Sequence, residues 1–136
     1  MQSTDPSILI VEDNEQLGAL YCKVLAHIGL QTYHTTSVEE TLVRLAAITP
    51  DIVLLDMNMY DGNGHIIVEY LKVNSRFKYT EIIIASGGAQ YRYYAEDQGI
   101  DHYFQKPISI PILVDFMKRL LGDRLPTRIS LGPLAY

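Results

Sequence analysis

The segment Asp51-Ile-Val-Leu-Leu-Asp56 decides the fold of this chain, because four consecutive apolar residues lie between two carboxylates. A continuously apolar run of this length is typical of a strand that is covered on both faces, as in a parallel sheet. Similar runs, Ile8-Leu-Ile-Val11 and Ile82-Ile-Ile-Ala85, lie before and after it. Weaker strand patterns occur at 102–105 and at 30–34, and the mixed polarity of the latter indicates an edge strand.

Helical patterns separate these runs. Apolar residues recur at i, i+3, i+4 and i+7 in the first pattern, and Ser37 with Glu40 matches a capping box at the start of the second. The five expected helices lie near 17–28, 37–46, 64–71, 89–98 and 109–122. A β-α unit repeated five times predicts an α/β fold with a doubly wound parallel sheet. Right-handed crossovers place helices on both faces, which gives a three-layer sandwich.

The size and composition fit one globular domain. The chain has 136 residues, of which 48% are hydrophobic, and a formal net charge of −5. We expect the domain over 1–122, and 123–136 to be a tail or truncated linker because it contains Pro126 and Pro133. The acidic balance argues against direct nucleic acid binding through a basic face. Neither a secretory signal nor an apolar run of ~20 residues is present, so we expect a cytoplasmic protein without membrane contact.

Charged and hydroxyl side chains follow the predicted strands. Glu12 and Asp13 follow the first, Asp56 the third, Ser86 the fourth and Lys106 the fifth. The carboxyl ends of parallel strands meet at one edge of an open sheet, where ligands bind. Three crowded carboxylates repel one another unless a cation joins them, and oxygen ligands favour Mg²⁺. The sequence therefore predicts an acidic Mg²⁺ pocket.

Such a pocket suits phosphoryl chemistry. Asp56 can act as a nucleophile, since a carboxylate can attack phosphorus to form an acyl phosphate. This reaction needs positioning and charge neutralisation, which Mg²⁺ and Lys106 would supply. Ser86 and the amides of the following two glycines would bind phosphoryl oxygens. Each signal is weak alone, and their joint placement at successive strand ends is the argument.

At this point the sequence resembles a response-regulator receiver domain of two-component signalling, of the chemotaxis-regulator kind, over roughly residues 7–122. The resemblance implies a flavodoxin-like (βα)5 fold with a five-stranded parallel sheet in the order 2-1-3-4-5. The matching motifs are Ile8-Leu-Ile-Val-Glu-Asp-Asn14, Asp51-Ile-Val-Leu-Leu-Asp56, Met59 with Gly64, Ile84-Ala-Ser86 and Tyr103-Phe-Gln-Lys-Pro107.

The resemblance also implies roles for single residues. Asp56 would be the phosphoacceptor, and Lys106 would pair with the phosphoryl group. Glu12, Asp13, Asp56 and the backbone carbonyl of Asn58 would hold Mg²⁺.

A switch and its partners are implied as well. Ser86 would move towards the phosphoryl group and Tyr103 would rotate inward, while the Lys106–Pro107 peptide is expected to be cis. The donor would be a sensor histidine kinase or a histidine phosphotransfer protein. The face formed by the fourth helix, the last strand and the last helix would control a downstream target or join a homodimer. The chain would not be a stand-alone enzyme, because it catalyses only its own phosphorylation and dephosphorylation.

Some positions depart from the family pattern. The common Met-Pro after the phosphoacceptor is Met59-Tyr60 here, and losing proline predicts a more mobile loop. Gly88 predicts a pocket mouth that side chains leave unshielded. Tyr91 and Tyr93 lie about 200° apart on a helix, so at least one tyrosine there should be exposed.

Two other classes of protein compete with this interpretation. A phosphorylation-independent pseudo-receiver would bind partners only, and the intact set of Glu12, Asp13, Asp56, Ser86 and Lys106 argues against it. A flavin-binding protein of the same topology would need a Ser/Thr/Gly-rich loop after the first strand, where this sequence is acidic. The cognate kinase and the target stay open, as does whether the chain is a complete regulator or a fragment of a larger protein.

Overall fold

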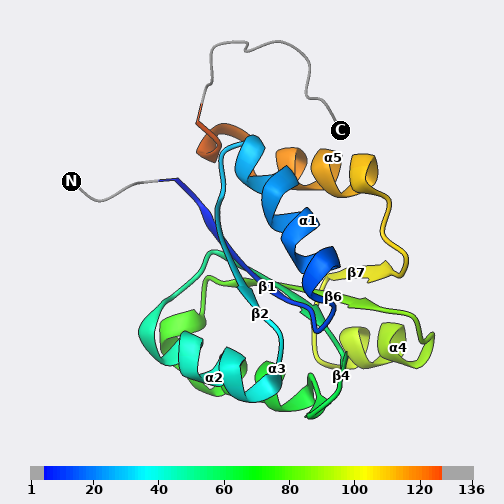
Figure 1. Cartoon of the computed structure of the whole chain (residues 1–136). Coiled ribbons are helices and arrows are strands. Elements are labelled where there is room, and N and C mark those ends of the chain that lie inside the picture. Colours follow the sequence, from blue (N-terminus) through cyan, green and yellow to red (C-terminus); the bar gives the residue numbers. More distant parts are fainter. Residues whose placement is uncertain (1–4, 127–136) are drawn as a thin grey trace.

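The computed structural model describes residues 5–126 (Figure 1). The strands of the main sheet are β1 (Ser7–Val11), β2 (Gln31–Thr35), β3 (Ile52–Asp56), β6 (Glu81–Ser86) and β7 (His102–Gln105). The helices are α1 (Glu15–His27), α2 (Val38–Ala47), α3 (His65–Val73), α4 (Gln90–Asp97) and α5 (Ile110–Leu121). Shorter elements are β4 (Asn58–Met59), β5 (Gly62–Asn63), η1 (Ser75–Phe77) and η2 (Gly122–Arg124).

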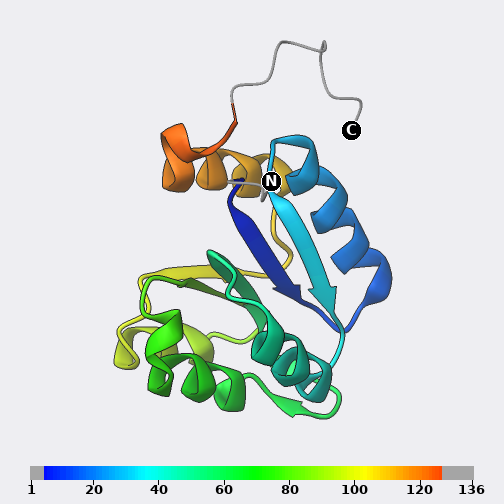
Figure 2. The ribbon, with the colours of Figure 1, turned by 90° about the vertical axis from the view of Figure 1, so that its left-hand side faces the viewer.

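The five strands of the main sheet are parallel, in the order β2-β1-β3-β6-β7. Helices α1 and α5 cover one face, and α2, α3 and α4 cover the other (Figures 1 and 2). The predicted order 2-1-3-4-5 is confirmed, since the small antiparallel pair β4–β5 forms a separate sheet. The doubly wound, flavodoxin-like prediction is therefore correct.

The apolar strands fill two separate cores, one on each side of the sheet. Leu9 and Val53 belong to the core beneath α2, α3 and α4, whereas Ile8, Ile10 and Leu54 belong to the core beneath α1 and α5. Every residue of β3 is buried. Successive side chains of a strand point to opposite faces, so only a continuously apolar strand can supply both cores.

The element boundaries agree with the predicted ones to within one or two residues. Ser37 caps α2, because its Oγ accepts a hydrogen bond from the Glu40 amide at 3.0 Å. The Glu40 carboxylate, however, accepts from the Thr36 amide at 3.0 Å, one residue before the position that a capping box predicts. The β4–β5 hairpin and the two 3₁₀ turns were not predicted, because each is too short to show a periodic pattern.

The chain beyond α5 packs back on the domain. Arg124 of η2 donates to Asp51 Oδ1 at 2.6 Å, and Asp51 Oδ2 accepts from the Ser7 amide at 2.8 Å. The domain boundary at 122 stays a prediction, and most of the expected tail, 127–136, lies outside the described residues. Among the helices of residues 5–126, none is both long enough and apolar enough to cross a bilayer.

We expect Gly64→Ala to destabilise the fold by about 1–3 kcal/mol, because it overpacks a filled core. A Cβ at Gly64 would lie 2.7 Å from Met57 Sδ and 3.2 Å from Leu55 Cδ2. Gly87→Ala is the matched control, because a Cβ there has no neighbour within 4 Å. Chemical denaturation of both variants measures the difference, and an equal effect of the two would contradict the packing argument.

Candidate functional site

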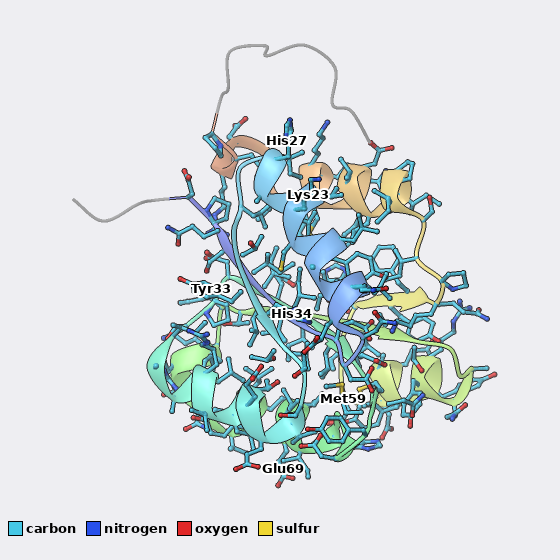
Figure 3. All side chains as sticks on the ribbon, viewed as in Figure 1. Lys23, His27, Tyr33, His34, Met59 and Glu69 are labelled. Atoms are coloured by element: carbon cyan, nitrogen blue, oxygen red, sulfur yellow. The ribbon has the colours of Figure 1, made fainter. Side chains whose placement is uncertain are left out.

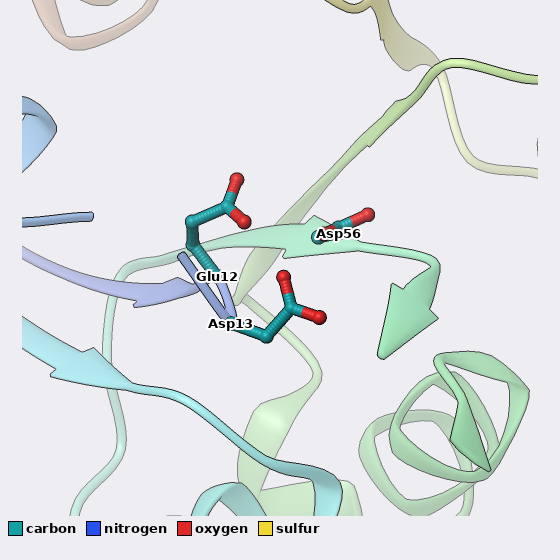
Figure 4. A group of neighbouring side chains, drawn as sticks. All are labelled: Glu12, Asp13 and Asp56. Carbon is teal, nitrogen blue, oxygen red and sulfur yellow. The ribbon is translucent and has the colours of Figure 1, made fainter. Parts of the chain in front are cut away.

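Three carboxylates meet at the carboxyl edge of the sheet. Glu12 and Asp13 follow β1, and Asp56 ends β3 (Figure 4). One oxygen from each residue lies within 4.8 Å of the others. Glu12 and Asp56 are buried, whereas Asp13 is partly exposed. The register of β1 with β3 brings Val11 opposite Leu55, so the acidic residues that follow are neighbours in space.

Lys106 supplies the positive charge of this cluster. Its ammonium forms an ion pair with Glu12 and a longer one, of 3.3 Å, with Asp56 Oδ2. The Lys106 amide donates to the carbonyl of Ser86 at 2.9 Å, which places the lysine directly after β7 and beside the end of β6. The Lys106–Pro107 peptide is cis, as the family resemblance implied.

The pKa values reflect burial and crowding. Burial raises the pKa of Asp56 to about 6, against the opposing effects of Lys106 and of the Asn58 amide, which donates to Asp56 Oδ1 at 3.1 Å. Burial and the neighbouring Glu12 raise the pKa of Asp13 as well. Burial alone would raise the pKa of Glu12, but hydrogen bonds from Lys106 and Asn14 lower it. Lys106 therefore compensates the charge of Glu12 more fully than that of Asp56. When all three carboxylates are ionised, the cluster keeps a net negative charge near Asp13 and Asp56.

This donor set fits a hard divalent cation. The available ligands are carboxylate oxygens, and Mg²⁺ prefers oxygen ligands of which one or two are carboxylates, with several waters retained. Asp13 and Asp56 have the raised pKa values that a nearby dication would lower. Glu12, Asp13 and Asp56 are thus the candidate ligands, and the Asn58 backbone lies close by because its amide bonds Asp56.

Ser86 ends β6, and Tyr103 lies on the neighbouring strand β7, opposite Ile84. Ser86 is fully buried, and its Oγ accepts a hydrogen bond from the Gly88 amide at 3.1 Å. The half-buried Tyr103 donates its hydroxyl to the Gly88 carbonyl at 3.1 Å, and the Arg92 guanidinium lies 5.3 Å from its ring centroid. Both residues therefore hold the turn after β6 in this arrangement.

The loop between β3 and α3 makes side-chain hydrogen bonds to α2 and α4. Asp61 accepts hydrogen bonds from the amides of Val38 and Glu39, at 2.9 and 3.2 Å, and so caps the start of α2. Tyr91 of α4 donates to Asn58 Oδ1 at 3.0 Å. The expectation of a mobile loop stays a prediction, but the structure adds contacts that local sequence does not reveal, because their partners are 22 to 33 residues away.

His34 holds the backbone of Glu12 by a hydrogen bond that the sequence did not predict. It lies on β2 (Figure 3), and its Nε2 is 2.8 Å from the carbonyl oxygen of Glu12. Because a carbonyl can only accept, Nε2 is the donor. A Cβ at Gly18 of α1 would lie 2.0 Å from this atom, so the glycine makes room for the ring. Nothing in the sequence around His34 signals this contact.

The tyrosines of α4 face different surroundings. Tyr93 is 72% exposed, which confirms that one of them points outward. Tyr91 and Tyr94 pack against the core beneath α4, and Tyr94 meets the His65 ring edge-on at a centroid distance of 4.2 Å.

Comparison with known proteins agrees with this geometry. The family model for the response regulator receiver domain matches residues 8–118. The chain belongs to this family. Receiver domains act in phosphorylation-based signalling, generally bind Mg²⁺ at an acidic pocket, and interact with histidine kinases or phosphotransfer proteins.

Individual relatives share the full length of the domain. The polar-differentiation response regulator DivK of Brucella ovis is 30% identical over 121 residues, which is 86% of this chain and 97% of the relative. A receiver protein from Burkholderia phymatum has 25% identity and a TM-score of 0.76, covering 90% of this chain and all of that one. A signal receiver domain from Colwellia psychrerythraea shares the fold at a TM-score of 0.79 and 22% identity, over 88% of this chain and 100% of that one.

Asp56→Asn should stabilise the metal-free receiver domain at pH 7.5, by roughly 3 kcal/mol. A folded-state pKa raised from 3.8 to about 6 means that folding disfavours the ionised carboxylate. Below pH 4, Asp56 is protonated in the folded and the unfolded state, and the free energy of unfolding is at its full value. This stability is lost as the pH rises through 6, because ionisation of Asp56 then favours the unfolded state. The difference between Asp56→Asn and the wild type should therefore disappear near pH 4, and denaturation at several pH values measures it.

Asp61→Asn is the control of opposite sign. Backbone hydrogen bonds lower the pKa of Asp61, so loss of its charge should destabilise the domain above pH 4. Equal behaviour of the two variants would show that the burial of Asp56 does not govern its titration.

Gly18→Ala should destabilise the domain by about 1–3 kcal/mol and weaken Mg²⁺ binding, because the added methyl displaces the His34 ring from Glu12. His34→Ala should cost stability by itself, but in the double variant Gly18→Ala should cost almost nothing more. A double-mutant cycle by denaturation measures this coupling, and additive effects would refute it.

Proposed function

We propose that this receiver domain is a phosphorylation switch in a two-component phosphorelay, with Asp56 as the phosphoacceptor. The observation that carries the proposal is the position of the Asp56 carboxylate, which lies buried at the end of β3, paired with Lys106 and within reach of Glu12 and Asp13. A phosphohistidine of a sensor kinase or phosphotransfer protein is the donor. An oxygen of Asp56 attacks phosphorus, the P–N bond breaks, and an acyl phosphate forms.

The surrounding residues would stabilise the charge that the phosphoryl group brings. Mg²⁺, held by Glu12, Asp13, Asp56 and the Asn58 carbonyl, would supply charge neutralisation on the phosphoryl oxygens. Lys106 already contacts Asp56 Oδ2, so its ammonium can pair with an oxygen of the transferred group. The Asn58 amide keeps Asp56 Oδ1 in place, which fixes the orientation of the attacking carboxylate.

Ser86 and Tyr103 would form the switch. Ser86 would exchange its hydrogen bond with the Gly88 amide for a phosphoryl oxygen. Tyr103 now bonds the Gly88 carbonyl, so a change in that turn would release it to rotate inward. New charge-assisted contacts would thereby shift the balance between the conformations of the α4-β7-α5 face. This face would control a partner protein, or a second copy of the chain, without any separate enzymatic substrate.

A pseudo-receiver that ignores phosphorylation is the alternative. It would keep the fold without need for a metal site. The clustering of the Glu12, Asp13 and Asp56 carboxylates around Lys106 favours the phosphorylated switch, because a protein without use for a dication gains nothing from such crowding.

Incubation with acetyl phosphate and Mg²⁺, followed by intact-mass measurement, tests the proposal. We expect a gain of one phosphoryl mass that disappears in Asp56→Asn and in excess EDTA. Asp115→Asn is the matched control, since this exposed carboxylate lies on α5, outside the carboxylate cluster, and should leave the gain intact. Absence of a gain with acetyl phosphate and with a phosphohistidine donor would favour the pseudo-receiver.

A further inference from the structure

The phenol of Tyr91 reaches from α4 to the loop that follows the candidate phosphoacceptor. Its hydroxyl donates to Asn58 Oδ1 at 3.0 Å, across 33 residues of sequence. The ring is half-buried against the core beneath α4, and its centroid lies 6.1 Å from that of His65. A ring that packs against the core in this way can hold the side chain of the exposed Asn58 through its hydroxyl.

Asn58 links this contact to the site. Its backbone amide donates to Asp56 Oδ1 at 3.1 Å, so one residue joins the α4 phenol and the central carboxylate. On the other side of the same loop, Asp61 is bonded to the start of α2. The loop is therefore held between two helices, and Tyr91 provides the hold on the side of α4.

We propose that Tyr91 is a positioning residue for the Mg²⁺ and phosphoryl site. By fixing the Asn58 side chain, it keeps the Asn58 amide on Asp56 and would keep the Asn58 backbone carbonyl in place as a ligand for Mg²⁺. The inference rests on the proposed function, since it assigns a role in metal binding at that site. The group that carries it is the hydroxyl alone, because a phenylalanine would keep the ring contacts.

The chain offers a matched control for this hydroxyl. Tyr93 lies two residues further along α4 and is 72% exposed, so Tyr93→Phe makes the same chemical change away from the loop. Asn58→Ala removes the side-chain oxygen that accepts the Tyr91 hydrogen bond and retains the Asn58 backbone carbonyl. Because this variant leaves the Tyr91 ring packed, it tests the same hydrogen bond if Tyr91→Phe lowers the stability of the fold.

Two measurements test the role of Tyr91. In metal-free protein, hydrogen exchange of the Asn58 amide should speed up in Tyr91→Phe and stay unchanged in Tyr93→Phe. Mg²⁺ titration followed by NMR should show affinity roughly 2- to 10-fold weaker in Tyr91→Phe, the size expected for one hydrogen bond. Asn58→Ala should weaken Mg²⁺ binding similarly, and the double variant should be no worse than either single variant.

The rate of phosphorylation by acetyl phosphate distinguishes positioning from general destabilisation. At low Mg²⁺, the phosphorylation rate of Tyr91→Phe should be lower than that of the wild type by the same factor as its Mg²⁺ affinity. At saturating Mg²⁺, the two rates should be equal. Equal Mg²⁺ affinity in Tyr91→Phe and Tyr93→Phe, or additive losses in the double variant, would overturn the inference while leaving phosphorylation of the wild type intact. Failure of the wild type to gain a phosphoryl mass would instead overturn the proposed function, and this role with it.

Discussion

The ammonium of Lys106 contacts both Glu12 and Asp56, and the acidic site depends on this interaction. Buried carboxylates cost free energy unless a positive charge or hydrogen bonds compensate them. Burial raises the pKa of Asp56 and, together with the neighbouring Glu12, that of Asp13, and the single ammonium of Lys106 does not offset these effects. The remaining negative charge favours a divalent cation, which fits the acidic pocket where receiver domains generally bind Mg²⁺.

The parallel sheet creates this crowding. Strands β1 and β3 run side by side with their carboxyl ends at the same edge, so residues that are 43 or 44 positions apart in the chain become neighbours. The apolar side chains of both strands fill two cores, and burial of that area stabilises the sheet against the repulsion at its edge. The site thus places unfavourable charge on a well-packed scaffold, as is common where function requires it.

Contacts from β2, α2 and α4 hold the segments that carry the acidic residues. His34, which fits against Gly18 of α1, bonds the Glu12 carbonyl, and Asp61 fastens the loop after β3 to α2. Tyr91 joins the same loop to α4. Through Gly18 of α1 and through α2 and α4, the segments of the site are connected to helices on both faces of the sheet. The proposed switch would act through contacts of this kind.

The sequence by itself determined the fold class and the acidic set. Continuous apolar runs specify strands with two buried faces, and the residues after each run must meet at one edge whatever the details of packing. Tertiary structure alone decided the β4–β5 hairpin and the bonds of His34, Asp61 and Tyr91. The reason is physical: periodicity is a local property of the chain, whereas each of these bonds joins side chains to groups that only the folded sheet and its helices bring within reach.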